Sequence, residues 1–188
     1  MSAAAVSDAQ LIARVLVQDD RHAFGELVRR HQSAVRACLR KLTAGNHALA
    51  DDLAQETFLL AYRNLKSFRQ EAKFSTWLYR IAYNAFLADL RKTKELPLPD
   101  DEDIDDAAMP DDTAVPVARA AALSIDLQRA MAVLTDAERA AIVQCYHNDL
   151  SHEEAAFVLG CPVGTVKTHI LRAKQKLKAR LGAWAPEG

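Results

Sequence analysis

The chain has 188 residues, half of them apolar, with 24 Lys and Arg against 25 Asp and Glu. This length and composition indicate a globular protein of one medium domain or two small ones, with enough apolar residues to form cores. No basic segment precedes an apolar run at the N-terminus, and no run of about 18 apolar residues occurs, which argues against a signal peptide and membrane insertion and favours a cytoplasmic protein.

The near-neutral charge conceals three blocks of different sign. Residues 1–94 carry 15 basic against 9 acidic side chains, residues 95–118 carry 9 acidic and no basic ones, and residues 119–188 carry 9 basic against 7 acidic ones. The middle block also contains four prolines and no apolar periodicity, which is typical of an extended or disordered linker. We therefore expect an all-α protein with two small helical domains, at 8–94 and 119–182, joined by an acidic flexible linker at 95–118.

Helix signals follow one another through the first domain. Asp20 is a predicted N-cap, Gly45 a stop signal and Ser75 a second N-cap. Four helices are expected, over about residues 8–17, 20–42, 48–66 and 75–93.

The helix over 48–66 has a polar face that contains a leucine. On a helical wheel, one half is apolar and the other half is acidic and amide-rich. A leucine inside such a patch is typical of a protein-docking site, although single exposed leucines are common on any surface. The predicted docking residues are Asp51, Asp52, Gln55, Glu56 and Leu59.

Aromatic residues are concentrated in the first domain. Eight of the twelve fall within residues 58–86, interleaved with basic side chains. Rings with positive charge between them can stack on unpaired bases, and the polar loop over 67–73 could wall a pocket for an extruded base. The alternative is that rings such as Phe58, Phe74 and Trp77 belong to the core. The candidates for nucleic-acid contact are Phe68, Arg69, Lys73, Trp77 and Arg80.

The second domain has the pattern of a helix-turn-helix. A helix over about 117–133 is followed by two capping boxes, Thr135 with Glu138 and Ser151 with Glu154. Gly160 can then adopt the left-handed conformation that ends a helix, and a longer helix follows at once. Four helices are therefore expected in this domain.

The last helix, over residues 163–181, carries six basic and no acidic side chains. An apolar stripe (Val166, Ile170, Ala173, Leu177, Leu181) is flanked on both sides by basic residues, with a mixed outward face between them. This arrangement matches a duplex groove with phosphate walls and base edges, whereas solvated surface helices usually mix charges. The candidates are Thr165, Lys167, Thr168, Leu171, Arg172, Lys174, Gln175, Lys176 and Lys178.

No pattern indicates an enzyme or a metal site. Gly-rich phosphate loops, paired carboxylates in a credible pocket and activated nucleophiles are missing from the sequence. The odd number of scattered cysteines (Cys38, Cys145, Cys161) favours reduced thiols. Cys145, His147, His152 and Cys161 match no zinc-ligand spacing, so no metal or cofactor is expected.

Three segments together resemble one family. They are DDLAQETF (51–58), SFRQEAKFSTWLYRIAYN (67–84) and LSHEEAAFVLGCPVGTVKTHILRAKQKL (150–177). Over about residues 8–182, the chain is similar to the extracytoplasmic-function sigma factors, the two-domain members of the bacterial sigma-70 family. The resemblance implies a transcription initiation factor that guides RNA polymerase to promoters and performs no chemistry itself.

The resemblance also implies roles for the surfaces. The DDLAQETF helix would bind the β′ clamp helices of core RNA polymerase. The loop at 67–73 and the following helix, with Asn84, would capture a flipped base of the promoter −10 element. Lys167, Thr168, Leu171 and Arg172 would face the −35 element. The linker would run through the polymerase active-site and RNA-exit channel, and a membrane-anchored anti-sigma factor would cover both domains.

One position departs from the family pattern. Many relatives carry arginine where this chain has Lys167, and lysine cannot make the planar bidentate contact with a base. Arg172 keeps that geometry for guanine. A stand-alone helix-turn-helix regulator is the main alternative, but it leaves the first domain and the acidic linker without a role.

Overall fold

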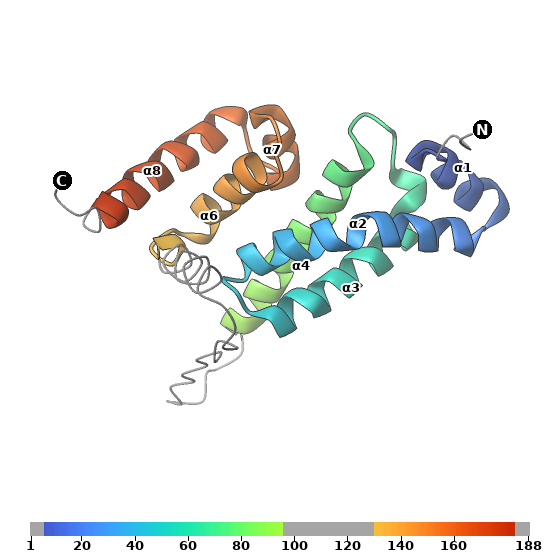
Figure 1. Ribbon diagram of the computed structural model, residues 1–188, viewed down its shortest axis with the longest axis horizontal. Coiled ribbons are helices and arrows are strands. Elements are labelled where there is room, and N and C mark those ends of the chain that lie inside the picture. Colours follow the sequence, from blue (N-terminus) through green and yellow to red (C-terminus); the bar gives the residue numbers. More distant parts are fainter. Residues whose placement is uncertain (1–5, 96–129, 183–188) are drawn as a thin grey trace, which may run out of the picture.

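The computed structural model describes residues 6–95 and 130–182, which form helices joined by short loops (Figure 1). The all-α prediction is confirmed for these residues. Glu95, the first residue of the linker predicted at 95–118, is the last residue of α4, and the rest of that linker lies outside the described residues, as does most of the helix predicted over 117–133. The helices of the first domain are α1 (Asp8–Gln18), α2 (Arg21–Leu42), α3 (His47–Asn64) and α4 (Phe74–Glu95), and those of the second are α6 (Asp136–Ile142), α7 (His152–Leu159) and α8 (Val163–Gly182).

The predicted start of α2 is confirmed. A carboxylate oxygen of Asp20 accepts a hydrogen bond from the backbone N–H of Ala23 at 3.0 Å, which satisfies one of the free donors of the first turn. Beyond the end of the helix, Gly45 has a φ of 92°, which favours glycine, and its N–H donates to the Arg40 carbonyl at 2.8 Å. This glycine therefore stops α2 as the sequence indicated.

Ser75, the N-cap predicted for α4, is at the wrong position. Helix α4 begins at Phe74, so Ser75 lies inside its first turn. Helical bonding starts earlier because the N–H of Trp77 donates to the Lys73 carbonyl at 3.1 Å. Before it, α3 ends at Asn64 and a short 3-10 turn, η1 (Leu65–Ser67), leads into the polar loop.

Leucines from three helices form the core of the first domain. Leu27 and Leu39 of α2, Leu65 after α3, and Leu78 of α4 are each at most 1 % exposed. Full burial of such a side chain stabilises the fold by about 1.5–3 kcal/mol. Helices α2, α3 and α4 pack on one another around these residues, and α1 packs on α2. This framework fixes the outer faces of α3 and α4.

Both capping boxes of the second domain are confirmed. The Thr135 and Ser151 hydroxyls accept from the N–H groups of Glu138 and Glu154, and each glutamate accepts from the N–H of its cap residue at 2.9 Å. Gly160 has the expected left-handed conformation, with a φ of 64°. It ends α7 so that α8 can start at Val163.

An element that the sequence did not indicate lies between α6 and α7. Residues Val143–His147 form a π-helical turn, η2, in which the N–H of Asn148 donates to the Val143 carbonyl at 3.0 Å. Such turns contain one more residue than an α-helical turn and occur often at functional positions. Gln144 and Tyr146 leave this turn in very different environments, the first fully buried and the second 54 % exposed.

The two domains contact each other in this structure. Helix α4 packs against α7, and α2 packs against η2 and α6. Figure 1 shows α6, α7 and α8 grouped at one end of the molecule, with α2, α3 and α4 running side by side beyond them. The contact surface therefore includes part of α4, the helix that holds several predicted −10 residues.

Candidate DNA and protein interfaces

Helix α8 presents the surface expected for DNA. Its apolar stripe packs into the domain core at Val166, Ile170 and Ala173, which are at most 5 % exposed. Thr165 is half-buried, and the other eight candidate residues of α8 are exposed. Leu171 is 58 % exposed on the outward side of the helix. The outward face of α8 is therefore free of other elements among the described residues.

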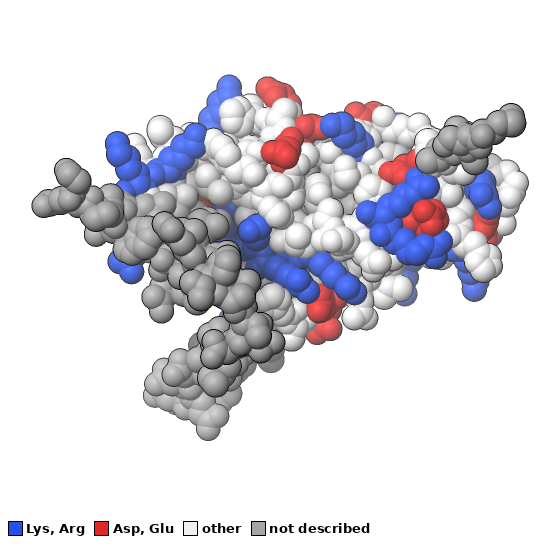
Figure 2. Space-filling model, in the orientation of Figure 1, with Lys and Arg blue, Asp and Glu red and all other residues white. Residues whose placement is uncertain are grey.

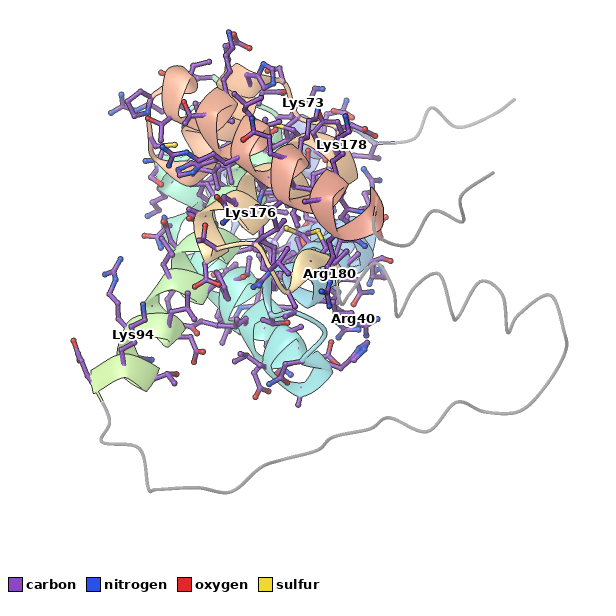
Figure 3. All side chains as sticks on the ribbon, turned by 90° about the vertical axis from the view of Figure 1, so that its left-hand side faces the viewer. Arg40, Lys73, Lys94, Lys176, Lys178 and Arg180 are labelled. Atoms are coloured by element: carbon purple, nitrogen blue, oxygen red, sulfur yellow. The ribbon has the colours of Figure 1, made fainter. Side chains whose placement is uncertain are left out.

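The basic residues of α8 are not equivalent. Lys176 and Lys178 point to opposite sides of the helix, as expected for positions two residues apart (Figure 3). The ammonium of Lys176 lies 2.7 Å from a carboxylate oxygen of Glu138, whose side chain is only 5 % exposed. Within residues 6–95 and 130–182, no carboxylate is in ion-pair distance of Lys167, Arg172 or Lys178.

One carboxylate oxygen of Glu138 makes two contacts. It accepts hydrogen bonds from the Lys176 ammonium and from the N–H of Thr135. Burial raises the pKa of this carboxyl, but the hydrogen bonds from Lys176 and Thr135 outweigh it and hold the pKa below its usual value. A depressed pKa means that the stabilisation is present above the ordinary glutamate range and is lost as pH falls through the folded-state pKa.

Glu138→Gln is expected to lower the free energy of unfolding by roughly 1–3 kcal/mol at neutral pH, because a charge-assisted hydrogen bond is lost and Lys176 loses its partner. The difference between wild type and variant should shrink as pH falls below the ordinary glutamate pKa of 4.5 and then through the lower pKa of Glu138 in the folded wild type. Urea denaturation between pH 3.5 and 7.5 measures both effects. An equal deficit across this range would contradict the ionic role of Glu138.

A second contact restrains the other side of α8. The Lys174 ammonium lies 4.9 Å from the centroid of the Tyr146 ring, which belongs to η2. An exposed cation–π contact of this kind contributes about 0.5–1 kcal/mol. Lys174 therefore remains accessible to a phosphate while its stem is held near the surface of the domain. Figure 2 shows Lys and Arg side chains at the end of the molecule that contains α8.

The aromatic residues of the first domain divide into two groups. Tyr79, Tyr83 and Phe86 are at most 8 % exposed and belong to the core. Of the three rings for which a core position was the alternative, Phe74 is buried, whereas Phe58 and Trp77 are half-buried. Phe68 and Trp77 are half-buried and pack on Phe74, with ring centroids 5.5 and 5.7 Å from its ring. These two rings are held in place yet keep an open edge.

The polar loop projects beyond this ring cluster. Its side chains Arg69 and Lys73 are exposed, and Gln70 has a φ of 58°, a left-handed conformation that is uncommon for glutamine. The sharp turn at Gln70 allows the loop to fold back from η1 to the start of α4. Arg69 and Lys73 thus lie at the same end of the helical bundle as the half-buried rings of Phe68 and Trp77.

Arg80 and Asn84, one turn apart on α4, differ in their surroundings. Asn84 is exposed. The guanidinium carbon of Arg80 lies 4.4 Å from the centroid of the Phe157 ring, which belongs to α7 of the second domain. The candidate −10 residues therefore do not form one open surface in this structure, because Arg80 is turned towards the other domain.

The predicted docking face of α3 is largely exposed. Asp52, Gln55, Glu56 and Leu59 all face outward, and Leu59 is 60 % exposed. Asp51 differs because its carboxylate lies 3.6 Å from Nε of Arg36 and 3.7 Å from an Nη of Arg40, both on α2. Asp51 thus links α3 to α2 at the edge of the patch.

A groove that the sequence analysis missed adjoins this face. It lies between α2 and α3, has a volume of about 540 Å³, and its walls include Leu59, Phe24 and Tyr62 with Arg21 and Arg36. Phe24, Arg21 and Arg36 lie on α2, for which the sequence analysis predicted no functional role. The exposed leucine is therefore one wall of an apolar groove with basic side chains, and not an isolated residue.

The structure was also searched for metal and membrane sites. The part of the chain at 6–95 and 130–182 holds no group of three or more His, Cys, Asp and Glu residues placed to share a metal ion. No helix in that part is both long enough and apolar enough to cross a bilayer.

Comparisons with known proteins agree with this architecture. Residues 27–95 match the family Sigma-70 region 2, and residues 124–177 match Sigma-70, region 4. The chain is 39 % identical over 176 residues to the ECF RNA polymerase sigma factor SigM of Mycobacterium tuberculosis, covering 94 % of this chain and 85 % of SigM. It is 37 % identical over 175 residues to SigW of Bacillus subtilis, with 86 % and 90 % covered.

Solved structures give the same result. CnrH in complex with the cytosolic domain of CnrY is 30 % identical, with a TM-score of 0.68 and coverage of 94 % of this chain and 97 % of that one. RpoE of Bartonella quintana, in complex with the anti-sigma factor NepR, is 25 % identical, with a TM-score of 0.64 and coverage of 85 % and 96 %. The chain belongs to the extracytoplasmic-function sigma factors of the sigma-70 family. It is a non-enzymatic factor that directs RNA polymerase to promoters.

Proposed function

We propose that the chain divides promoter recognition between its domains and docks on polymerase through the first. Helix α8 reads the −35 element, the loop at 67–73 with α4 binds the melted −10 element, and the exposed face of α3 binds the β′ clamp helices. The observation that carries this division is the separation of two basic surfaces, on α8 and on the loop, from an apolar groove beside Leu59.

Run-off transcription tests the proposal. Purified protein with core RNA polymerase should produce a defined transcript from a promoter that contains both elements, and neither component alone should. A stand-alone helix-turn-helix regulator would bind the −35 duplex without copurifying with core polymerase or starting transcripts. That result would overturn the proposal.

We further propose control by an anti-sigma factor, membrane-anchored and covering both domains. The support is that CnrH was solved in complex with the cytosolic domain of CnrY, and RpoE in complex with the anti-sigma factor NepR. A pull-down from membranes of the source organism with the tagged full chain should recover such a partner. Addition of that partner should stop run-off transcription, and continued transcription would reject it as an inhibitor.

A narrower proposal is that the chain controls a cobalt and nickel resistance operon. CnrH and NccH, at 30 % and 33 % identity, are similar to the chain, but so are SigM and SigW, at 39 % and 37 %. Sequencing of transcript 5′ ends with and without cobalt or nickel tests it. Induction by either metal of transcripts that need this factor supports the proposal, and indifference to both refutes it.

A further inference from the structure

A cavity lies where the end of α2 and the start of α3 meet the second domain. Its volume is about 490 Å³, which is within the range of small-molecule sites. The described residues that line it belong to α2 and the loop after it, to the start of α3, and to α6, η2 and the residues just before α6. None of the residues proposed for contact with DNA or polymerase is among them, so promoter recognition leaves this cavity without a role.

Part of the lining is apolar. Val143 of η2 is 1 % exposed and Ile142 of α6 is half-buried, so both present aliphatic surface that the fold holds in place. Ala37, Met131 and the ring of Tyr146 also line the cavity. Such a lining favours a ligand with an apolar or aromatic body, because binding removes the apolar surface of that body from water.

The charged part of the lining has a single sign. Its basic side chains are Arg40, Lys41, His47 and His147, and the described lining residues include no Asp or Glu. Lys41 has no carboxylate in ion-pair distance within residues 6–95 and 130–182. Arg40 lies 3.7 Å from the Asp51 carboxylate but shares it with Arg36, so one carboxylate faces two guanidinium groups. The lining therefore carries an excess of positive charge.

His147 experiences this positive charge. Partial burial and the charge of Lys41 both lower the pKa of its imidazole, while Asp149 acts in the opposite direction. A neutral imidazole can still donate one hydrogen bond to an anion. The Lys174 ammonium adds a further cation beside the cavity, 4.9 Å from the centroid of the Tyr146 ring.

We infer that this cavity is a binding site for a small organic anion, whose acidic group contacts Arg40 and Lys41 and whose apolar or aromatic body lies against Ile142 and Val143. Guanidinium and ammonium groups bind both carboxylate and phosphate, so the acidic group is one of these two. A neutral apolar ligand would leave the cations without a partner, and an inorganic anion would leave the apolar lining in contact with water. The site stands apart from the proposed promoter recognition, because its residues have no part in it.

Four probes test the two halves of this site in the full chain. 1-Naphthyl phosphate and 1-naphthoate carry both a ring and an anion, 1-naphthol lacks the anion, and inorganic phosphate lacks the ring. Naphthalene fluorescence, or equilibrium dialysis for inorganic phosphate, should show saturable binding of the two naphthyl anions, roughly tenfold or more tighter than that of 1-naphthol or phosphate. The tighter of the two anions shows whether phosphate or carboxylate is the preferred acidic group.

Two variants with matched controls locate the binding. Lys41→Gln should weaken binding of both naphthyl anions roughly two- to fivefold, the range for one exposed ionic contact, and leave 1-naphthol binding unchanged. Lys66→Gln, exposed on η1 and outside the cavity, is its charge control. Ala37→Phe fills part of the cavity while all the basic side chains remain, and should abolish binding. Ala34→Phe, exposed on the same helix and outside the cavity, controls for an added ring.

Absence of saturable binding would overturn the inferred site, as would equal affinity for 1-naphthol and the naphthyl anions or unchanged affinity in both Lys41→Gln and Ala37→Phe. Far-UV circular dichroism shows whether Ala37→Phe folds, and Lys41→Gln alone decides if it does not. The groove between α2 and α3 also combines apolar walls with arginines, Arg21 and Arg36. Weaker binding in Arg21→Gln but not in Lys41→Gln would place the probes in that groove and refute the site.

Discussion

Arg172→Ala is expected to weaken binding to the cognate −35 duplex by roughly 1–3 kcal/mol and to relax the preference at one base pair. Arg172 is exposed on the outward face of α8 and has no carboxylate in ion-pair distance among residues 6–95 and 130–182. Its guanidinium is thus available for a bidentate contact with guanine. Titration against a set of duplexes with single base-pair changes measures both effects.

Lys174→Ala is the matched control on the same helix. It also removes one positive charge, but Lys174 lies towards Tyr146 at the side of α8 and is expected to contact phosphate. Its loss should weaken all duplexes about equally and reduce the salt-dependence slope by about 1. If both variants show the same sequence-independent loss, Arg172 contacts only phosphate and the assignment of the outward face is wrong.

A second large effect, on binding to polymerase or to DNA, is expected when either of two leucines with nearly equal exposure is replaced by alanine. Leu59 on α3 is 60 % exposed and Leu171 on α8 is 58 % exposed. Leu59→Ala should weaken binding to core polymerase by roughly 1–2 kcal/mol, as for an apolar residue central to an interface, and leave −35 binding unchanged. Leu171→Ala should do the reverse. Each variant therefore controls for surface truncation in the other.

Polymerase binding is measured by titration of labelled core enzyme, and −35 binding by titration of the duplex, with the full chain in both cases. Glu56→Arg tests the charge of the same α3 face and should also weaken polymerase binding alone. If Leu59→Ala impairs both activities, misfolding is the cause. If it impairs neither, the groove between α2 and α3 is not the docking site.

Two roles are open for Lys167 on the same helix, contact with a base or contact with phosphate. It is exposed near the start of α8. Lys167→Arg separates two roles: a base reader should gain sequence preference from the bidentate group, whereas a phosphate contact should show little change. The measured quantity is the ratio of affinities for cognate and altered −35 duplexes.

Local features of the fold could be predicted from sequence because their causes lie within a few residues. Asp20, the Thr135 and Ser151 capping boxes, and Gly160 all act on their own turn of helix. The stripe of α8 followed from helical periodicity. Ser75 was misplaced as a cap because α4 begins at Phe74, two residues before the start that an N-cap at Ser75 implies, which is within the usual uncertainty of helix ends.

Contacts between distant residues could not be predicted in this way. Lys176 and Glu138 are 38 residues apart in the sequence. The lack of acidic residues in 163–181 therefore did not mean that no acidic side chain lies beside α8 in the fold. Arg80 meets Phe157 only because the domains pack together. The groove beside Leu59 requires residues from two helices. Each of these features changes the interpretation of a candidate residue, but none changes the fold class.

The π-helical turn at Val143–His147 makes the fold depend on the number of residues in this segment. Removing one residue there would restore an α-helical turn and rotate the following residues by about 100° relative to α6. The side-chain amides of Gln144 and Asn148, which donate to the Cys38 sulfur at 3.7 and 3.2 Å, would then no longer reach it together. A single deletion in this turn is therefore expected to misalign the contacts between the second domain and α2.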